Sequence, residues 1–237
     1  MYAREIDGQE LTFGVSGKLI MNALVMYDRQ TDSLWSQFLG VAVEGEFSGA
    51  HLEPLASTLT DWQTWRTLHP DTLLLDQGGR RLDQYESYYA SESAGVLGEL
   101  VRDDRLRTKD LVLGVQLEDG HRAYAYRHLS EYQVLNDLVG STALAVFFDR
   151  RQGTASAWDR TVEGRLLTFA AGEGVAPDGG PVTIDTETGS RWSALGGAAF
   201  DGELAGTQLL QVPATPMFWF AWTDFFPDGS LWTRALD

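Results

Sequence analysis

The sequence contains no cysteine and very little lysine. The absence of cysteine excludes disulfide bonds, thiolate nucleophiles and cysteine-ligated metal sites together. Only Lys18 and Lys109 are lysines among 18 basic residues, whereas 34 residues are acidic and the net charge is −16. Because an acidic surface repels phosphate backbones, nucleic acid is not an expected partner.

Long apolar runs are also missing. Stretches such as Ala143–Phe148 are far shorter than the roughly 20 residues that a membrane-spanning helix needs. Met1–Asp7 contains no apolar signal region, so the chain as written is expected to be cytoplasmic. The chain has 237 residues, 43% of them hydrophobic, which indicates a folded globular protein with a substantial core.

The chain contains an internal repeat with an offset of 157 residues. Residues 28–71 align without a gap on residues 185–228, and 16 of the 44 aligned pairs are identical. Tryptophan, glycine and proline are prominent among the identities, which include Trp35/Trp192, Gly45/Gly202, Trp62/Trp219, Trp65/Trp222 and Pro70/Pro227. Self-similarity at a fixed offset predicts two related structural units.

The first unit carries strand signals followed by one helix. Leu19–Tyr27 is an apolar run, and Val41–Glu44 and His51–Leu55 are typical of short strands. Apolar residues then recur every three positions from Leu59 to Leu68 and stop before Pro70, which predicts a short amphipathic helix. Thr60 is its expected N-cap.

The second unit is expected to begin near Asp110. Strands at Leu111–Leu117 and Arg122–Tyr126 flank the hairpin signal Glu118-Asp119-Gly120. Ser130–Val139 is predicted to be a helix ending at Gly140, and Thr142–Phe148 a buried strand. Pro216–Phe226 corresponds to the helix of the first unit but is apolar on nearly all sides, so it should be buried.

These signals predict a β-rich α+β fold with two tandem pseudo-symmetric repeat units. Each unit is expected to be a small antiparallel or mixed sheet, or a partial barrel, with a short tryptophan-containing helix. The expected boundaries are residues 1–75 for the first unit, 76–109 for a connector and 110–237 for the second unit. The first unit lacks a counterpart of roughly the first 50 residues of the second, so it is expected to expose unpaired strand edges that favour a homodimer.

One string of residues resembles a known family. Phe13–Leu19, Leu24–Arg29 and Ser33–Gln37, together with Trp62-x-x-Trp65 and His69–Thr72, resemble the bacterial and archaeal domain-of-unknown-function family 3179. The resemblance covers nearly the whole chain. It implies a fold and no assigned activity.

Members of that family usually carry a His-Glu-x-x-Asn-Asp stretch and a Cys-Pro-x-Cys stretch upstream, and many have an export signal. In this chain the degenerate counterpart reads Tyr132–Asp137, with Tyr132 in place of the histidine. Phe148–Arg151 lies where the cysteines would be. Metal or thiol chemistry therefore cannot be transferred from the family to these positions.

Residues that differ between the two copies are the best candidates for a site. Ser16, Lys18, Arg29 and Gln37 are polar in the first copy, whereas Gln37 corresponds to Ala194 and Arg29 to Thr186 in the second. The Gly14–Lys18 segment matches neither a phosphate-binding loop nor a nucleophile elbow, because the required flanking residues are missing. Arg29 could offer a planar fork to a carboxylate or phosphate.

Histidine and tryptophan give no further site. None of the four histidines forms a ligand pair at a zinc-binding spacing, and no cofactor or metal is expected. His69 is interpreted as the residue that ends the helix before Pro70. The six repeated tryptophans are predicted to be core rather than a sugar-stacking platform, because both copies keep them at helical spacing.

Three functions remain open at this point. The first is a small-ligand-binding module with a cleft between the units, using Ser16, Lys18, Arg29 and Gln37. The second is an enzyme whose metal- or cysteine-bearing segment lies upstream. The third is a structural or oligomerisation module.

Overall fold

The computed structural model describes residues 1–76, 78 and 85–233. Part of the predicted connector, residues 77 and 79–84, lies outside the described residues. Small open sheets dominate the fold, and α-helix is confined to short segments. This confirms the predicted β-rich α+β class. Within the described residues, every strand pair is antiparallel except that of β8 with β20.

The N-terminal part consists of a hairpin and a four-stranded sheet with the order β3-β4-β5-β6. Its elements are β1 (Glu5–Ile6), β2 (Gln9–Glu10), β3 (Phe13–Ile20), β4 (Ala23–Asp28), β5 (Leu34–Ser36) and β6 (Ala42–Glu44). Trp35 is fully buried at its centre, packed among Leu11, Ala42 and Leu52. The helices α1 (Trp62–Leu68) and α2 (Glu86–Ala90) follow.

The rest of the chain forms two central sheets and a second outer sheet. The strand orders are β19-β7-β8-β20, β18-β11-β10-β9 and β14-β15-β16-β17. Their elements are β7 (Leu111–Leu117), β8 (Gly120–Ala125), α3 (Tyr126–Leu129), β9 (Val134–Val139), β10 (Thr142–Asp149), β11 (Thr154–Asp159), β14 (Phe169–Val175), β15 (Pro181–Asp185), β16 (Arg191–Ser193), β17 (Ala199–Asp201), β18 (Leu210–Val212), β19 (Ala214–Phe218), α4 (Trp219–Phe225) and β20 (Ser230–Leu231). A short hairpin of β12 (Thr161–Val162) and β13 (Arg165–Leu166) precedes β14.

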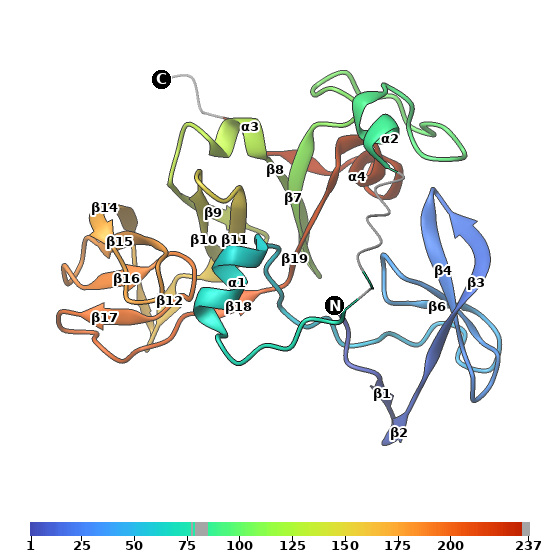
Figure 1. The fold of residues 1–237 in the computed structure, drawn as a ribbon, viewed down its shortest axis with the longest axis horizontal. Helices are drawn as coiled ribbons and strands as arrows, with labels where there is room; N and C mark the ends of the chain where they lie inside the picture. Colours follow the sequence, from blue (N-terminus) through green and yellow to red (C-terminus); the bar gives the residue numbers. More distant parts are fainter. Residues whose placement is uncertain (77, 79–84, 234–237) are drawn as a thin grey trace.

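The sheets of this larger part pack on one another through common hydrophobic cores. One face of β7 and β8 packs on the β9–β11 sheet, with Leu113 and Val146 in the same core. Their opposite face packs on α4 through Val112 and Trp222. The far side of β10 carries Phe147 into the core of the β14–β17 sheet. Figure 1 shows the β14–β17 sheet and the β3–β6 sheet at opposite ends, with β7 to β11 between them.

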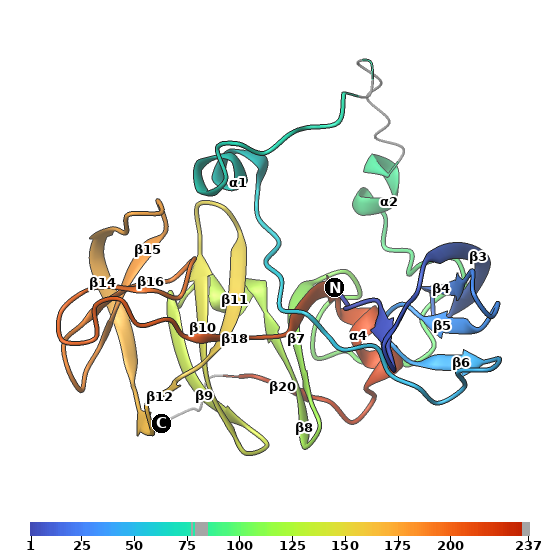
Figure 2. The ribbon, with the colours of Figure 1, turned by 90° about the horizontal axis from the view of Figure 1, so that it is seen from below.

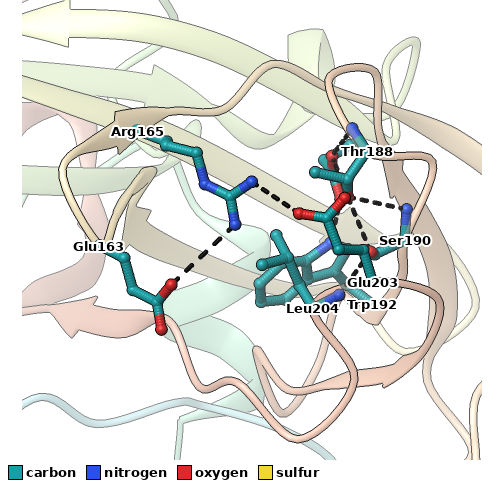
Figure 3. Close-up of polar contacts among 8 residues, drawn as sticks. Glu163, Arg165, Thr188, Ser190, Trp192, Glu203 and Leu204 are labelled. Carbon is teal, nitrogen blue, oxygen red and sulfur yellow. Dashed lines mark hydrogen bonds and ion pairs between the residues drawn. The ribbon is translucent and has the colours of Figure 1, made fainter.

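A buried aspartate organises each outer sheet in the same way. Asp185 accepts hydrogen bonds from the Thr188 backbone N–H at 2.6 Å and from Trp192 Nε1 at 2.9 Å. Thr188 and Ser190 hydroxyls lie 2.7 Å apart, beside the exposed ion pair of Arg165 with Glu203 (Figure 3). In the β3–β6 sheet the corresponding bonds to Asp28 are 2.6 Å from the Thr31 N–H and 2.8 Å from Trp35 Nε1.

The predicted helix at Ser130–Val139 is wrong. Residues Val134–Val139 form β9, and Tyr126–Leu129 supplies the only helical turn nearby in the described chain. Val139 pairs with Thr142, so Gly140 and Ser141 form a two-residue hairpin loop, with Gly140 at φ 55°. Gly140 therefore marks a hairpin and not a helix end.

The predicted strand at His51–Leu55 is also wrong, because only isolated bridges occur there, between Val41 and His51 and between Tyr2 and Pro54. Other predicted elements are confirmed. The β7–β8 hairpin turns at Glu118 and Asp119, and β10 is almost completely buried.

The two tryptophan helices differ in burial. Trp219 and Trp222 of α4 are buried, as are Trp35 and Trp192, which confirms the core prediction for these four. Trp62 and Trp65 of α1 are 43% and 40% exposed, so the prediction is wrong for them. The reason is that α1 buries Thr64 instead and lies beside the β10–β11 turn (Figure 2).

The capping residues of α1 agree with the sequence prediction at one end of the helix and differ from it at the other. Asp61, not Thr60, is the N-cap, and its side chain accepts a hydrogen bond from Thr64 N–H at 2.7 Å. Thr60 instead bonds Thr154 at the end of β11, at 3.1 Å between hydroxyls. His69 is the C-cap, as predicted.

Candidate functional site

A cavity of about 590 Å³ lies between the N-terminal part and the β19–α4 segment. The sequence contains four methionines, and all four line this space, which we call the methionine cavity. Its apolar wall is completed by phenylalanines on both sides. These residues are Met1, Met21, Met26, Met217, Phe13, Phe38, Phe220 and Phe225.

A strained turn carries one methionine into the wall. Ile20 pairs with Ala23, so Met21 and Asn22 form the two-residue loop between β3 and β4. Their φ angles are 49° and 65°, which defines a left-handed turn. Asparagine tolerates this conformation, whereas methionine does so at a cost of about 1–2 kcal/mol. This turn places Met21 among the residues that line the cavity.

Aromatic stacking closes the cavity across the two parts of the chain. Phe38, which follows β5, stacks on Phe225 of α4 with ring centroids 4.1 Å apart. The Tyr2 hydroxyl donates to the Phe38 carbonyl at 2.5 Å, and burial raises the pKa of Tyr2. A side chain at Gly40 would overlap the Tyr2 ring, with a Cβ only 2.4 Å from its Cε1. Glycine at this position is therefore required for the closure.

A short segment of the connector, residues 97–101, joins the two walls, and we call it the strap. Asn22 accepts from Leu97 N–H at 2.7 Å and donates to the Gly98 carbonyl at 2.8 Å. At the other end, the buried Asp224 of α4 accepts from the N–H groups of Leu100 and Val101 at 2.9 and 2.8 Å. The strap thus fixes the β3–β4 loop relative to α4.

A second cavity of about 670 Å³ adjoins the first, and both contact Met1, Tyr2 and Met217. We call it the histidine cavity, because His51 and His121 line it. Its other polar lining residues include Gln116 and Glu118. The His121 ring lies 4.5 Å from that of Phe226, just beyond α4.

Of the four residues proposed from the sequence, Gln37 lines the methionine cavity and is exposed there. Ser16, Lys18 and Arg29 are not among the described residues that line either cavity. Ser16 donates to the Val25 carbonyl at 2.6 Å and accepts from Lys18 N–H at 3.1 Å, at the irregular part of β3. Arg29 Nη1 donates to the Phe13 carbonyl at 2.5 Å, and its guanidinium lies over Tyr27.

Sequence reasoning missed the methionines. They occur at positions 1, 21, 26 and 217, so no spacing connects them. The one available signal was their scarcity combined with their apolar surroundings, since two of the four lie within Leu19–Tyr27. In the described part of the chain, no three histidine, aspartate or glutamate side chains gather closely enough to hold a metal ion.

The fold and this site define a β-rich α+β domain of small open sheets with an apolar cavity between its parts. The chain belongs to the family described as "Protein of unknown function (DUF3179)", which it matches over residues 1–229. No curated protein and no solved structure matches it. Among the helices in the described residues, none combines the length and hydrophobicity needed to cross a membrane.

Replacement of Met21 by glycine should distinguish the backbone strain of the turn from the contribution of the Met21 side chain to the cavity. Glycine relieves the left-handed backbone but loses the side-chain contacts, so the free energy of unfolding should change by less than about 1 kcal/mol. Affinity for an apolar probe should fall. Urea denaturation and titration with the neutral dye N-phenyl-1-naphthylamine measure the two effects. Unchanged dye affinity would show that Met21 does not contact the bound dye.

Proposed function

We propose that this protein binds a small apolar molecule in the methionine cavity. The observation that carries the proposal is the gathering of all four methionines of the chain in one cavity, together with phenylalanines from both walls. The volume of about 590 Å³ lies within the range of ligand sites, and an apolar lining with few polar groups is typical of them. Methionine side chains adapt to ligands of different shapes.

Gln37 is the proposed polar contact of this ligand. It is the sequence candidate that lines the cavity, and its equivalent in the second outer sheet is the buried Ala194. Ser16, Lys18 and Arg29 remain candidates for a separate contact on the outer side of β3 and β4. Under this proposal the domain is a ligand-binding module, whether or not it also catalyses a reaction.

Filling the cavity provides the direct test. Ala221 of α4 lines it, and replacement by tryptophan should weaken binding of N-phenyl-1-naphthylamine by about tenfold or more, since the indole would occupy the ligand's space. Val15→Trp is the matched control, because Val15 lies 68% exposed on β3. Gln37→Ala should weaken dye binding and Arg29→Ala should not. If wild type and Ala221→Trp bind the dye equally, the cavity is not the site.

We also propose that the domain consists of two tandem repeat units. The sheets β3–β6 and β14–β17 have the same strand order, and Asp28 and Asp185 accept matching hydrogen bonds. The C-caps of α1 and α4 also have nearly equal angles, φ −129° and −130°. These similarities support two tandem units, at residues 1–75 and 110–237, joined by residues 76–109. In this arrangement the cavity lies where the first unit meets the helix of the second.

A further inference from the structure

All the sulfur of this chain lies around the methionine cavity. The sequence has four methionines and no cysteine, so the methionine thioethers are its only sulfur atoms. All four methionines line the cavity. Peroxides oxidise thioether sulfur to the polar sulfoxide, and exposed side chains react first. An oxidant of this class therefore acts on residues of the proposed ligand site.

The four methionines differ in their access to solvent. Met26 and Met217 are half-buried, and they pack against the hydrophobic cores of the β3–β6 sheet and of α4. Met1 is 75% exposed, so a sulfoxide at this residue can stay hydrated outside the cavity. Met21 is 37% exposed and also lines the cavity. Among the four, Met21 thus combines access for an oxidant with a position in the cavity wall.

The turn that carries Met21 is held in place. The strap fixes the next residue, Asn22, through the Leu97 N–H at 2.7 Å and the Gly98 carbonyl at 2.8 Å. The oxidised side chain then has two arrangements. If it stays in the wall, a polar sulfoxide oxygen faces apolar side chains. If it rotates into water, the wall loses the apolar contact that the thioether made. Both arrangements weaken the binding of an apolar ligand.

We propose that Met21 is an oxidation site that controls ligand binding in the methionine cavity. A peroxide transfers one oxygen to the Met21 sulfur, its O–O bond breaks, and the other oxygen leaves as water or an alcohol. The sulfur loses two electrons and the peroxide gains them. The product is methionine sulfoxide, and the apolar ligand is released. The inference rests on the proposed function and adds the regulation of that site.

Mild oxidation of the whole chain tests the proposal. The protein is treated with dilute hydrogen peroxide in the presence of a metal chelator, and peptide mass spectrometry follows each methionine. Met21 should be oxidised before Met26 and Met217. Affinity for N-phenyl-1-naphthylamine should fall about fivefold or more in step with Met21 oxidation. The midpoint of urea denaturation should change little at this stage, because Met26 and Met217 are still reduced in the cores.

Two leucine variants assign the effect to one residue. Leucine keeps an apolar side chain of similar volume and cannot be oxidised. Met21→Leu should bind the dye as the wild type does before treatment and should keep most of that affinity after it. Met26→Leu is the matched control and should remain as sensitive to peroxide as the wild type. An equal loss of affinity in Met21→Leu and wild type would contradict the role of Met21.

Enzymatic reduction distinguishes regulation from damage. Methionine sulfoxide reductases specific for each sulfoxide epimer, with dithiothreitol as the reductant, return the thioether, while the oxygen leaves as water and the dithiol becomes a disulfide. Dye affinity should recover with the Met21 thioether, and its failure to recover would overturn the inference. Unchanged affinity of the oxidised wild type would also overturn it while leaving the proposed function intact. Failure of the dye to bind the untreated protein would overturn the proposed function itself.

Discussion

Replacing Gly114 with alanine is expected to destabilise the protein by about 3 kcal/mol, because the new methyl group has no space in a packed core. Gly114 lies in the centre of β7, under the ring of Trp222. A Cβ at this position would lie 2.4 Å from Trp222 Cζ3 and 3.3 Å from Met217 Cε. Since strand and ring are both held by neighbours, α4 would have to move away from the sheet.

The same substitution should weaken ligand binding, because Met217 and Phe220 are carried by β19 and α4. Urea denaturation and dye titration measure the two effects. A double-mutant cycle with Trp222→Leu isolates the contact. Each single variant should be destabilised, and the double variant should be more stable than the sum of the two losses predicts, because leucine leaves room for the new methyl group. Purely additive losses would mean that the strain arises elsewhere.

Replacing Asp28 with alanine is the second substitution with a large expected effect, a loss of about 3 kcal/mol. Asp28 is completely buried, and its carboxylate accepts hydrogen bonds from three donor groups, which are Trp35 Nε1 at 2.8 Å, the Thr31 backbone N–H at 2.6 Å and the Thr31 hydroxyl at 2.9 Å. Alanine would leave the buried Trp35 Nε1–H and the part-buried Thr31 backbone N–H without this acceptor. Urea denaturation followed by tryptophan fluorescence measures the loss.

Asp28→Asn separates the role of charge from that of shape. The amide keeps one acceptor oxygen but presents an N–H₂ group to a remaining donor, so the loss should be smaller than for alanine and still clear. Asp185→Ala should give a loss similar to that of Asp28→Ala, because the two aspartates have matching partners. Glu44→Ala, at an exposed position on β6, is the control and should change stability by less than about 0.5 kcal/mol.

The contribution of Asp28 should also depend on pH. Burial pushes the pKa of Asp28 upward, but hydrogen bonds from Trp35 and Thr31 outweigh it and hold the pKa below the ordinary 3.8. A group with a lowered folded-state pKa stabilises the protein above its unfolded-state pKa. This stabilisation is lost as the pH falls through the folded-state pKa. The stability difference between the wild type and Asp28→Ala should therefore be full at pH 7 and should begin to narrow as the pH falls below about 4.

The sequence was sufficient to predict elements whose signals are local. The helix at α1 followed from three-residue apolar spacing and the proline after it, and the β7–β8 hairpin from Glu118-Asp119-Gly120. Ser130–Val139 was misassigned because its apolar residues suit either a helix or a strand. Gly140 decides between them only once its pairing with β10 is known.

Features that depend on distant neighbours could not be predicted. Periodicity shows which face of α1 is apolar, but not whether anything covers it, so Trp62 and Trp65 could not be distinguished from Trp219 and Trp222. Likewise, Leu19–Tyr27 looks like one apolar run, whereas Met21 and Asn22 bend it into a hairpin. Comparison of residues 28–71 with residues 185–228 singled out Gln37, because a polar residue there corresponds to Ala194, and Gln37 lines the methionine cavity.

The strap also sets the maximum distance between the two walls of the cavity. Leu97 bonds the β3–β4 loop and Leu100 bonds α4, so three residue steps, at most about 11 Å of chain, limit the separation of the two walls. An inserted residue between these anchors would let the walls move apart, and a deletion would draw them together. A change in strap length alone would therefore change the width of the cavity while every lining side chain is kept.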